Sequence, residues 1–244
     1  MTPPPFTILR AHAPGPFVIF CDHASNHVPA ELNQLGVPPA ELARHIAWDI
    51  GAAGVATELS ALLDSPAILC GTSRLVIDCN RHLDASDLIP EQSDATIIPG
   101  NRQLSPDARR QRIERYFTSY HSAVEEVFRD RETRGVASIS LSIHSMTDNL
   151  AGSPRPWKIS FSSDSDRTLV EPVIERLRDL FGIESGDNQP YSMDPAVDYS
   201  TPYHALRRGL RYLQVEFRQD AIADETGQVL WARRLADAVG GVST

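Results

Sequence analysis

The chain has 244 residues, 41% of them hydrophobic and 23% charged, which is typical of a globular protein with room for one large α/β domain or two small ones. Its formal net charge of −9 argues against a surface for nucleic acid or for an anionic membrane, because such a surface carries a basic stripe. A local cluster of arginines could still bind a small anionic substrate.

The cysteines and the N-terminal residues favour a cytoplasmic protein. Cys21, Cys70 and Cys79 show neither a CxxC spacing nor an even count, which favours a reducing compartment. Residues 1–5 lack the basic start of a signal peptide, and no apolar run follows them. No apolar stretch approaches the ~18 residues that a membrane helix needs. We therefore expect neither a nucleic-acid nor a membrane partner, and the oligomeric state stays open.

Strands and helices are predicted to alternate along the chain, as in an α/β fold. Ser105 followed by Pro106 is a good helix N-terminus, and Gly182 is a good helix end. The absence of repeats and low-complexity linkers favours one domain over residues 1–244. The expected elements are strands at 17–21, 67–70, 75–79, 138–143, 157–162 and 211–218, helices at 39–63, 106–134, 166–181 and 225–239, and long loops at 84–104 and 187–203.

Two histidines stand where an apolar strand run ends. Residues 17–21 run directly into Asp22 and His23, and residues 139–143 run directly into His144. In an open α/β sheet, ligands and catalytic groups gather beyond the carboxyl ends of the strands. Two imidazoles at two strand ends therefore predict part of a metal site, whereas a single histidine of this kind is more often structural.

Asp49 lies on the apolar face of the predicted helix 39–63, at helical spacings from Leu42 and Ile46. A carboxylate that points inward needs a cation, a metal or several donors, because burying a bare charge is very costly. Asp49 is therefore a candidate metal ligand. The alternative is a structural salt bridge or a hydrogen bond to His45.

Further polar residues flank the predicted strand that follows the first helix. Asn80 and Arg81 lie just past its end, and Arg74 lies at its start. An arginine fork suits bidentate binding of a carboxylate, so Arg81 is a candidate substrate contact and Arg74 a weaker second. The alternative for Arg81 is a surface ion pair with Asp84 or Asp87.

Glu216 and the end of the second long loop complete the candidates. Glu216 lies inside the strand predicted at 211–218, where it could be a general base with a raised pKa or an ion-pair partner of Arg218. Tyr203 and His204 end the loop and could contact substrate, as loop residues on a rigid scaffold often do. The remaining histidines of the central chain are expected to be structural or exposed: His27, His45, His82 and His121.

Together these segments resemble the N-formylglutamate amidohydrolase family. The match runs in the right order over nearly the whole chain, which makes it more specific than any single motif. The matching pieces are CDHASN at 21–26 with Pro29, AWDIG at 47–51, SRLVIDCNR at 73–81, Tyr120-His121, SIHS at 142–145, NQPY at 188–191 and VEFRQD at 215–220.

The family is similar in fold to the zinc carboxypeptidases and aspartoacylases. The resemblance therefore implies a three-layer αβα fold with a mixed, mostly parallel central sheet. It also implies that His23 and His144 are metal ligands and that Glu216 is the general base. The Asn80-Arg81 pair is implied to bind the substrate carboxylate and to polarise its carbonyl, which makes Arg81 a catalytic residue.

One residue departs from the carboxypeptidase pattern His-x-x-Glu. The third residue after His23 is Asn26, and an amide is a poor zinc ligand. We therefore expect Asp49 to be the remaining ligand, with Asn26 supporting the site or contacting substrate.

The resemblance implies an enzyme that uses one divalent metal ion, expected to be Zn²⁺, to hydrolyse an N-acyl amino acid. The expected reaction converts N-formyl-L-glutamate, a small anionic substrate, to formate and L-glutamate. Two alternatives remain: a zinc acylase or carboxypeptidase with another substrate, and a metal-free binding protein on the same fold.

Overall fold

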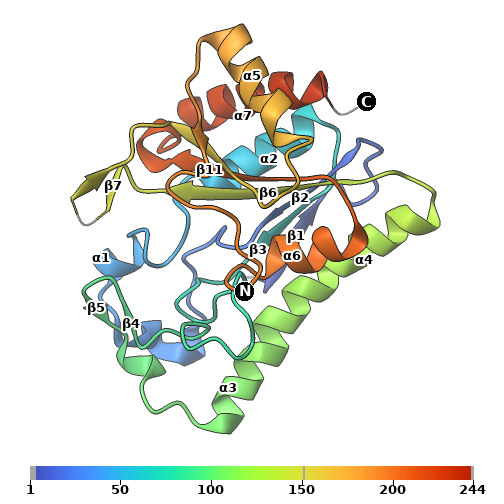
Figure 1. Cartoon of the computed structure of the whole chain (residues 1–244). Helices are drawn as coiled ribbons and strands as arrows, with labels where there is room; N and C mark the ends of the chain where they lie inside the picture. The colour runs from blue at the N-terminus through green and yellow to red at the C-terminus, as the bar shows by residue number, and fades with distance from the viewer. Residues whose placement is uncertain (1–3, 151, 243–244) are drawn as a thin grey trace.

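A seven-stranded sheet forms the central layer of the computed structural model, which describes residues 4–150 and 152–242 (Figure 1). The strands lie in the order β1, β3, β2, β6, β11, β9, β10. The pairs β1–β3 and β11–β9 are antiparallel and the other neighbours are parallel, which confirms the mixed, mostly parallel sheet. The strands are β1 Phe6–Leu9, β2 Phe17–Cys21, β3 Ala67–Cys70, β6 Ile139–Met146, β9 Ile159–Ser162, β10 Gly186–Asp187 and β11 Tyr212–Arg218.

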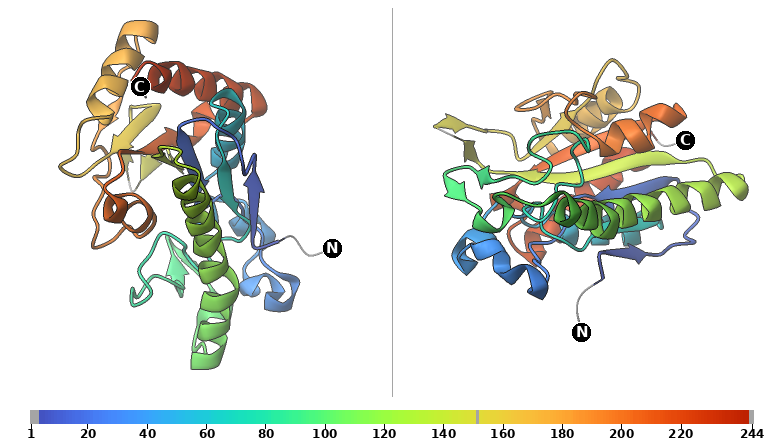
Figure 2. Two further views of the ribbon diagram at one scale, coloured as in Figure 1. Left: turned by 90° about the vertical axis from the view of Figure 1, so that its right-hand side faces the viewer. Right: turned by 90° about the horizontal axis from the view of Figure 1, so that it is seen from below.

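Helices cover both faces of the sheet, which gives the three expected layers. Figure 1 shows α2 (Ala52–Leu62), α5 (Val170–Phe181) and α7 (Glu225–Gly240) on one face. The opposite face is covered by α4 (Ser119–Thr133) and the short α6 (Ser200–His204), and α4 runs across it in the view from below in Figure 2. Each helix layer shares one large apolar core with the sheet.

Shorter elements connect these layers. Within the described residues no helix is both long and apolar enough to cross a membrane. The shorter elements are η1 Ala30–Gly36, α1 Pro39–Leu42, β4 Gln92–Ser93, β5 Thr96–Ile97, η2 Pro99–Asn101, α3 Pro106–Arg112, the π-helical turn η3 Ile113–Thr118, β7 Asn149–Leu150, β8 Ser153–Pro154, η4 Leu206–Arg208 and η5 Gln219–Ala221.

The central strands are buried on both faces. In β2, Phe17 and Ile19 pack into the core beneath α2 and α7, while Val18 and Phe20 pack into the core beneath α4. A parallel strand between two helical layers reads as a continuous apolar run for this reason. Strand β6 is also buried along its whole length and continues to Met146, so His144 lies inside this strand and not beyond its end.

The expected continuous helix over 39–63 is wrong. The chain forms α1, then a series of turns from Ala43 to Gly51, and only then α2. Gly51 has φ of 82°, and a Cβ at this position would lie 2.2 Å from the Ile222 carbonyl oxygen. This left-handed, closely packed glycine starts α2 in a new direction, and Asp49 lies in the turn before it.

The expected strand at 75–79 is also wrong, although Leu75, Val76 and Ile77 are fully buried. Side chains satisfy this segment's carbonyl groups in place of a neighbouring strand: Asn101 Nδ2 donates to the Leu75 oxygen at 2.8 Å, and Arg112 Nη1 donates to the Val76 oxygen at 3.0 Å. A short apolar run indicates burial, but it does not distinguish a strand from a buried turn.

The helix predicted from Ser105 is confirmed, since Ser105 Oγ accepts a hydrogen bond from the Ala108 amide at 3.2 Å at the start of α3. The helix end at Gly182 is confirmed as well, with φ of 65°. Both are local signals that do not depend on distant parts of the chain.

Candidate active site

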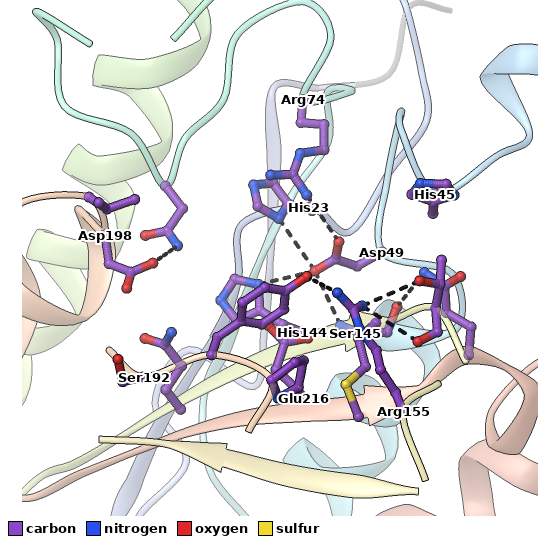
Figure 3. A pocket seen from close by; sticks show the side chains of 18 of the residues that line it. His23, His45, Asp49, Arg74, His144, Ser145, Arg155, Ser192, Asp198 and Glu216 are labelled. Carbon is purple, nitrogen blue, oxygen red and sulfur yellow. Dashed lines mark hydrogen bonds and ion pairs between the residues drawn. The ribbon is translucent and has the colours of Figure 1, made fainter. Parts of the chain in front are cut away.

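Three buried side chains converge at the carboxyl ends of the parallel strands: His23, Asp49 and His144 (Figure 3). Asp49 Oδ2 lies 3.3 Å from His23 Nδ1 and 3.0 Å from His144 Nδ1. One potential ligand atom from each residue lies within 4.8 Å of the others. This arrangement offers two imidazole nitrogens and one carboxylate oxygen, a donor set that suits a divalent metal such as zinc.

Backbone contacts hold Asp49 in this position. The Asp49 amide donates to the His23 carbonyl at 2.9 Å, and the Ser145 amide donates to Asp49 Oδ2 at 3.2 Å. The turn that replaces the predicted helix is thereby joined to the segment after β2 and to β6. Because of this turn, the carboxylate lies between the two histidines and not beneath α2.

The other ring nitrogen of each histidine has its own polar partner. His23 Nε2 lies 2.8 Å from Asp78 Oδ1, and His144 Nε2 lies 2.9 Å from Ser142 Oγ. Such partners fix the orientation of a metal-binding imidazole and raise its basicity. Both Nδ1 atoms are therefore left facing Asp49, and the three residues fit a metal ion.

Electrostatics favour a positive charge at this point. Burial and the Arg74 charge act against protonation of His23, but Asp78 and Asp49 outweigh them and raise the pKa of His23 to about 10. Although burial acts in the opposite direction, the facing histidines hold the pKa of Asp49 below its usual range. In the same way, Arg74 and His23 lower the pKa of Asp78 despite its burial. Asp49 and Asp78 therefore stabilise a positive charge between them.

Glu216 lies next to this cluster on β11. In the parallel pairing of β11 with β6, Glu216 stands opposite His144, and both residues line the same cavity. Burial raises the pKa of Glu216 to about 7, even though His144 and other cations act to lower it. A carboxylate with this pKa can take up and release a proton near neutral pH.

The cavity has a volume of about 500 Å³ and is open to solvent on one side. Arg74, Asn80 and Arg81 line it beside His23. Arg74 donates to Asp78 at 2.8 Å and lies 3.5 Å from Asp49, so its charge is already paired. Arg81 pairs with the exposed Asp87 at 2.8 Å, as the alternative reading of this residue predicted, yet it also faces the cavity.

Asn80 binds the protein's own backbone. Its Oδ1 accepts from the Tyr199 amide at 3.0 Å and from the Ser200 amide at 2.9 Å, while Nδ2 donates to Asp198 at 3.0 Å. Asn80 therefore fastens the segment that leads into α6 to the edge of the cavity. With these contacts it is a residue that shapes the cavity wall.

Three residues expected to contact substrate are not among the described residues that line the cavity: Asn26, Tyr203 and His204. Asn26 Nδ2 donates to the Leu42 carbonyl at 3.0 Å and so supports α1. His204 is fully buried beneath α4, where its Nδ1 lies 3.0 Å from Glu125 Oε1. We assign none of the three to substrate binding.

Several cavity residues escaped the sequence analysis. Arg155 and Tyr191 belong to segments with no regular periodicity, and His45 carried no motif of its own. Gln214 could have been found, because it lies two residues before Glu216 on the same face of β11. Tyr191 lies in the NQPY segment that carries the family resemblance, but it was given no role there; for Arg155 the sequence contained no comparable signal.

An α/β sheet with histidines and carboxylates gathered around one cavity at its carboxyl edge is the arrangement expected of an α/β enzyme with its active site beyond the strand ends. The family model for N-formylglutamate amidohydrolase matches residues 15–223. The chain therefore belongs to the N-formylglutamate amidohydrolase family, whose members are hydrolases acting on an amide bond.

Solved structures agree with this assignment of the fold. The crystal structure of gene product Atu2144 from Agrobacterium tumefaciens is 30% identical, with a TM-score of 0.93 over 98% of this chain and 95% of that chain. N-formylglutamate amidohydrolase from Ralstonia eutropha JMP134 is 23% identical, with a TM-score of 0.76 over 98% of this chain and 97% of that one. Among curated proteins, none matches the chain.

Proposed function

We propose that this protein is a metal-dependent amidohydrolase that converts N-formyl-L-glutamate to formate and L-glutamate, with Zn²⁺ as its metal. The observation that carries the proposal is the convergence of His23, Asp49 and His144 beside Glu216 at one end of the cavity. Membership of the N-formylglutamate amidohydrolase family supports the substrate.

His23 Nδ1, His144 Nδ1 and one Asp49 oxygen would hold the metal. A metal bound there would act as a Lewis acid and lower the pKa of a bound water towards ~7. Three protein ligands with a further open position are typical of catalytic zinc sites. The polar partners Asp78 and Ser142 keep the two rings turned towards this position.

Glu216 is the general base in this proposal. It accepts a proton from the attacking water, and it then donates that proton to the nitrogen of the leaving amine. The C–N bond of the formyl amide breaks, the water oxygen remains on formate, and the amine leaves as glutamate. The position of Glu216 opposite His144 in the sheet, with both residues lining the same cavity, supports this role.

Arg81 and Arg74 lie on the β3 side of the cluster. Arg74 contacts Asp49, so it lies close enough to stabilise negative charge that develops on the formyl oxygen. Arg81 pairs with an exposed carboxylate, and such pairs are weak, so a substrate carboxylate can compete for its guanidinium.

The decisive experiment measures bound metal and formate release together. We expect about one zinc per chain in the purified protein, and loss of both zinc and activity in His23→Ala and Asp49→Ala. His12→Ala is the matched control, because His12 is an exposed histidine outside the cavity. Absence of metal after zinc is supplied would exclude the metallohydrolase and favour a binding protein. Zinc together with hydrolysis of N-acetylglutamate or peptides, but not N-formylglutamate, would exclude the proposed substrate.

A further inference from the structure

Arg155 is a buried cation on the wall of the cavity. It lies between β8 and β9, and only 6% of its surface is exposed. Its Nη2 donates to the Tyr191 hydroxyl, its Nη1 lies 3.3 Å from Thr147 Oγ1, and its guanidinium carbon lies 4.9 Å from the centre of the Tyr191 ring. The Arg155 guanidinium therefore contacts neutral oxygen atoms and an aromatic ring.

Among the described residues, no carboxylate oxygen lies within 4.0 Å of the Arg155 guanidinium. In contrast, Arg74 and Arg81, the other arginines of the cavity, each have acidic partners. A buried charge without a counter-charge is costly, so its retention beside an open cavity points to an anion that enters from outside. The guanidinium has five donors in a fixed fork, which suits a carboxylate.

The surrounding chain holds Arg155 firmly in place. Arg218, at the end of β11, donates from Nη1 to the carbonyl oxygens of Arg155 at 2.9 Å and Pro156 at 3.1 Å. Arg218 is in turn paired with Asp220 at 2.7 Å. The carbonyl of Tyr191 accepts a hydrogen bond from Ser162 on β9 at 3.0 Å. The cation and its aromatic partner are thus both anchored to the sheet.

Arg155 lies on the opposite side of the metal cluster from Arg74 and Arg81. The segment after β3 carries Arg74 and Arg81, strands β2 and β6 lead to the histidines, and Arg155 precedes β9 at the far side of β11. Arg74 touches Asp49, whereas the side-chain contacts of Arg155 are with Thr147 and Tyr191. The carboxylate nearest the scissile amide can therefore be held by the arginines after β3, and Arg155 is available for a more distant one.

We propose that Arg155, supported by Tyr191, binds the side-chain carboxylate of the substrate and so selects dicarboxylic N-acyl amino acids over neutral ones. This inference rests on the proposed amidohydrolase function. In this inference, the second carboxylate of an N-acyl glutamate is bound by Arg155, a residue that takes no part in the hydrolysis itself.

The test compares N-formylglutamate with N-formylglutamine, which differ only in the charge of the side chain. We expect the wild-type protein to prefer N-formylglutamate by about 100-fold in kcat/KM, and Arg155→Met to reduce this preference to less than about threefold. Arg110→Met, which removes an exposed arginine outside the cavity, should leave the preference unchanged. An equal loss for both substrates, or no loss, would overturn the assignment.

Arg155→Lys covers the case in which the methionine variant does not fold. Lysine keeps the charge but not the planar fork, so the preference should still fall by at least about tenfold. An unchanged preference in a folded Arg155→Lys protein would contradict bidentate binding by Arg155.

A binding measurement separates this proposal from the amidohydrolase function. Calorimetry with N-acetylglutamate and N-acetylglutamine, on metal-free protein, needs no turnover. Selective loss of N-acetylglutamate binding in the Arg155 variants would support the anion site even if no substrate were hydrolysed. Hydrolysis of N-formylglutamate with unaltered selectivity in those variants would instead reject the anion site and leave the enzyme function standing.

Discussion

The metal-free protein should lose stability as the pH rises above neutrality, because folding keeps a proton on His23. Both ring nitrogens face carboxylates, Asp78 at 2.8 Å and Asp49 at 3.3 Å, so both must carry hydrogen to donate. Burial and Arg74 oppose this charge, but the two carboxylates prevail and raise the pKa of His23 to about 10. An unfolded histidine has a pKa of about 6.5.

The direction in which stability changes with pH follows from the raised pKa of His23. The stabilisation is fully present below the unfolded pKa of about 6.5, and it is lost as the pH rises towards the folded pKa of about 10. Between about pH 7 and pH 8.5, His23 is protonated in the folded state and neutral in the unfolded state. The slope is then about 1.4 kcal/mol per pH unit, so His23 accounts for a loss of about 2 kcal/mol across this window.

Urea unfolding of the metal-free protein and of His23→Gln at several pH values measures this loss. Asp49 and Asp78 stay ionised throughout, since their pKa values are lowered, and His144 remains in both proteins. We expect the free energy of unfolding to fall more steeply with pH in the wild type, by about 1.4 kcal/mol per pH unit. Parallel profiles for the two proteins would refute the argument that His23 is doubly protonated.

Three further changes test the site and its support. Glu216→Gln should lower kcat about 10²–10⁴-fold with zinc content unchanged, measured by formate release beside metal analysis; a smaller loss would exclude the general-base role. Asn80→Ala removes the hydrogen bonds to Asp198 and to two backbone amides, so thermal or urea unfolding should show a loss of about 2–3 kcal/mol, and an unchanged stability would contradict the fastening role. Glu125→Gln should cost about 1–2 kcal/mol in urea unfolding, because it removes the ion pair with Arg208 at 2.8 Å and weakens the contact with His204 Nδ1 at 3.0 Å; an unchanged stability would contradict this supporting role.

Much of the sheet was predictable because its strands carry local signals. The apolar runs of β2 and β11 indicate strands buried by helices, and their order along the chain matches the observed α/β arrangement. The failures occur where tertiary contacts decide the backbone. The run at 75–79 is buried without strand pairing. The helix predicted over 39–63 ends at Leu42 and begins again only after Gly51, which has a positive φ and packs closely against Ile222.

The site was predictable to the extent that chemistry coincided with strand ends. His23 and His144 were found in this way, whereas Glu216 was found as an acidic residue inside a predicted strand; the structure brings all three to one cavity. Asp49 was predicted from helical periodicity, although it lies in a turn. The periodicity correctly indicated that Asp49 is buried, but it wrongly indicated a helix. Arg155 could not be found, because its proposed role depends on Tyr191, 36 residues away, and on the lack of an acidic partner among the described residues.

Beside Asp49, a proton on His23 Nδ1 and a bound metal ion exclude each other. Asp49 Oδ2 faces three nitrogens, His23 Nδ1 at 3.3 Å, His144 Nδ1 at 3.0 Å and the Ser145 amide at 3.2 Å. The contact with His23 satisfies the carboxylate only when that ring carries a proton on Nδ1, and a metal ligand must lose this proton. The apparent zinc affinity should therefore rise about tenfold per pH unit over the window in which the metal-free protein loses stability. These opposite trends have one cause, because the proton that stabilises the metal-free protein is the one that zinc displaces.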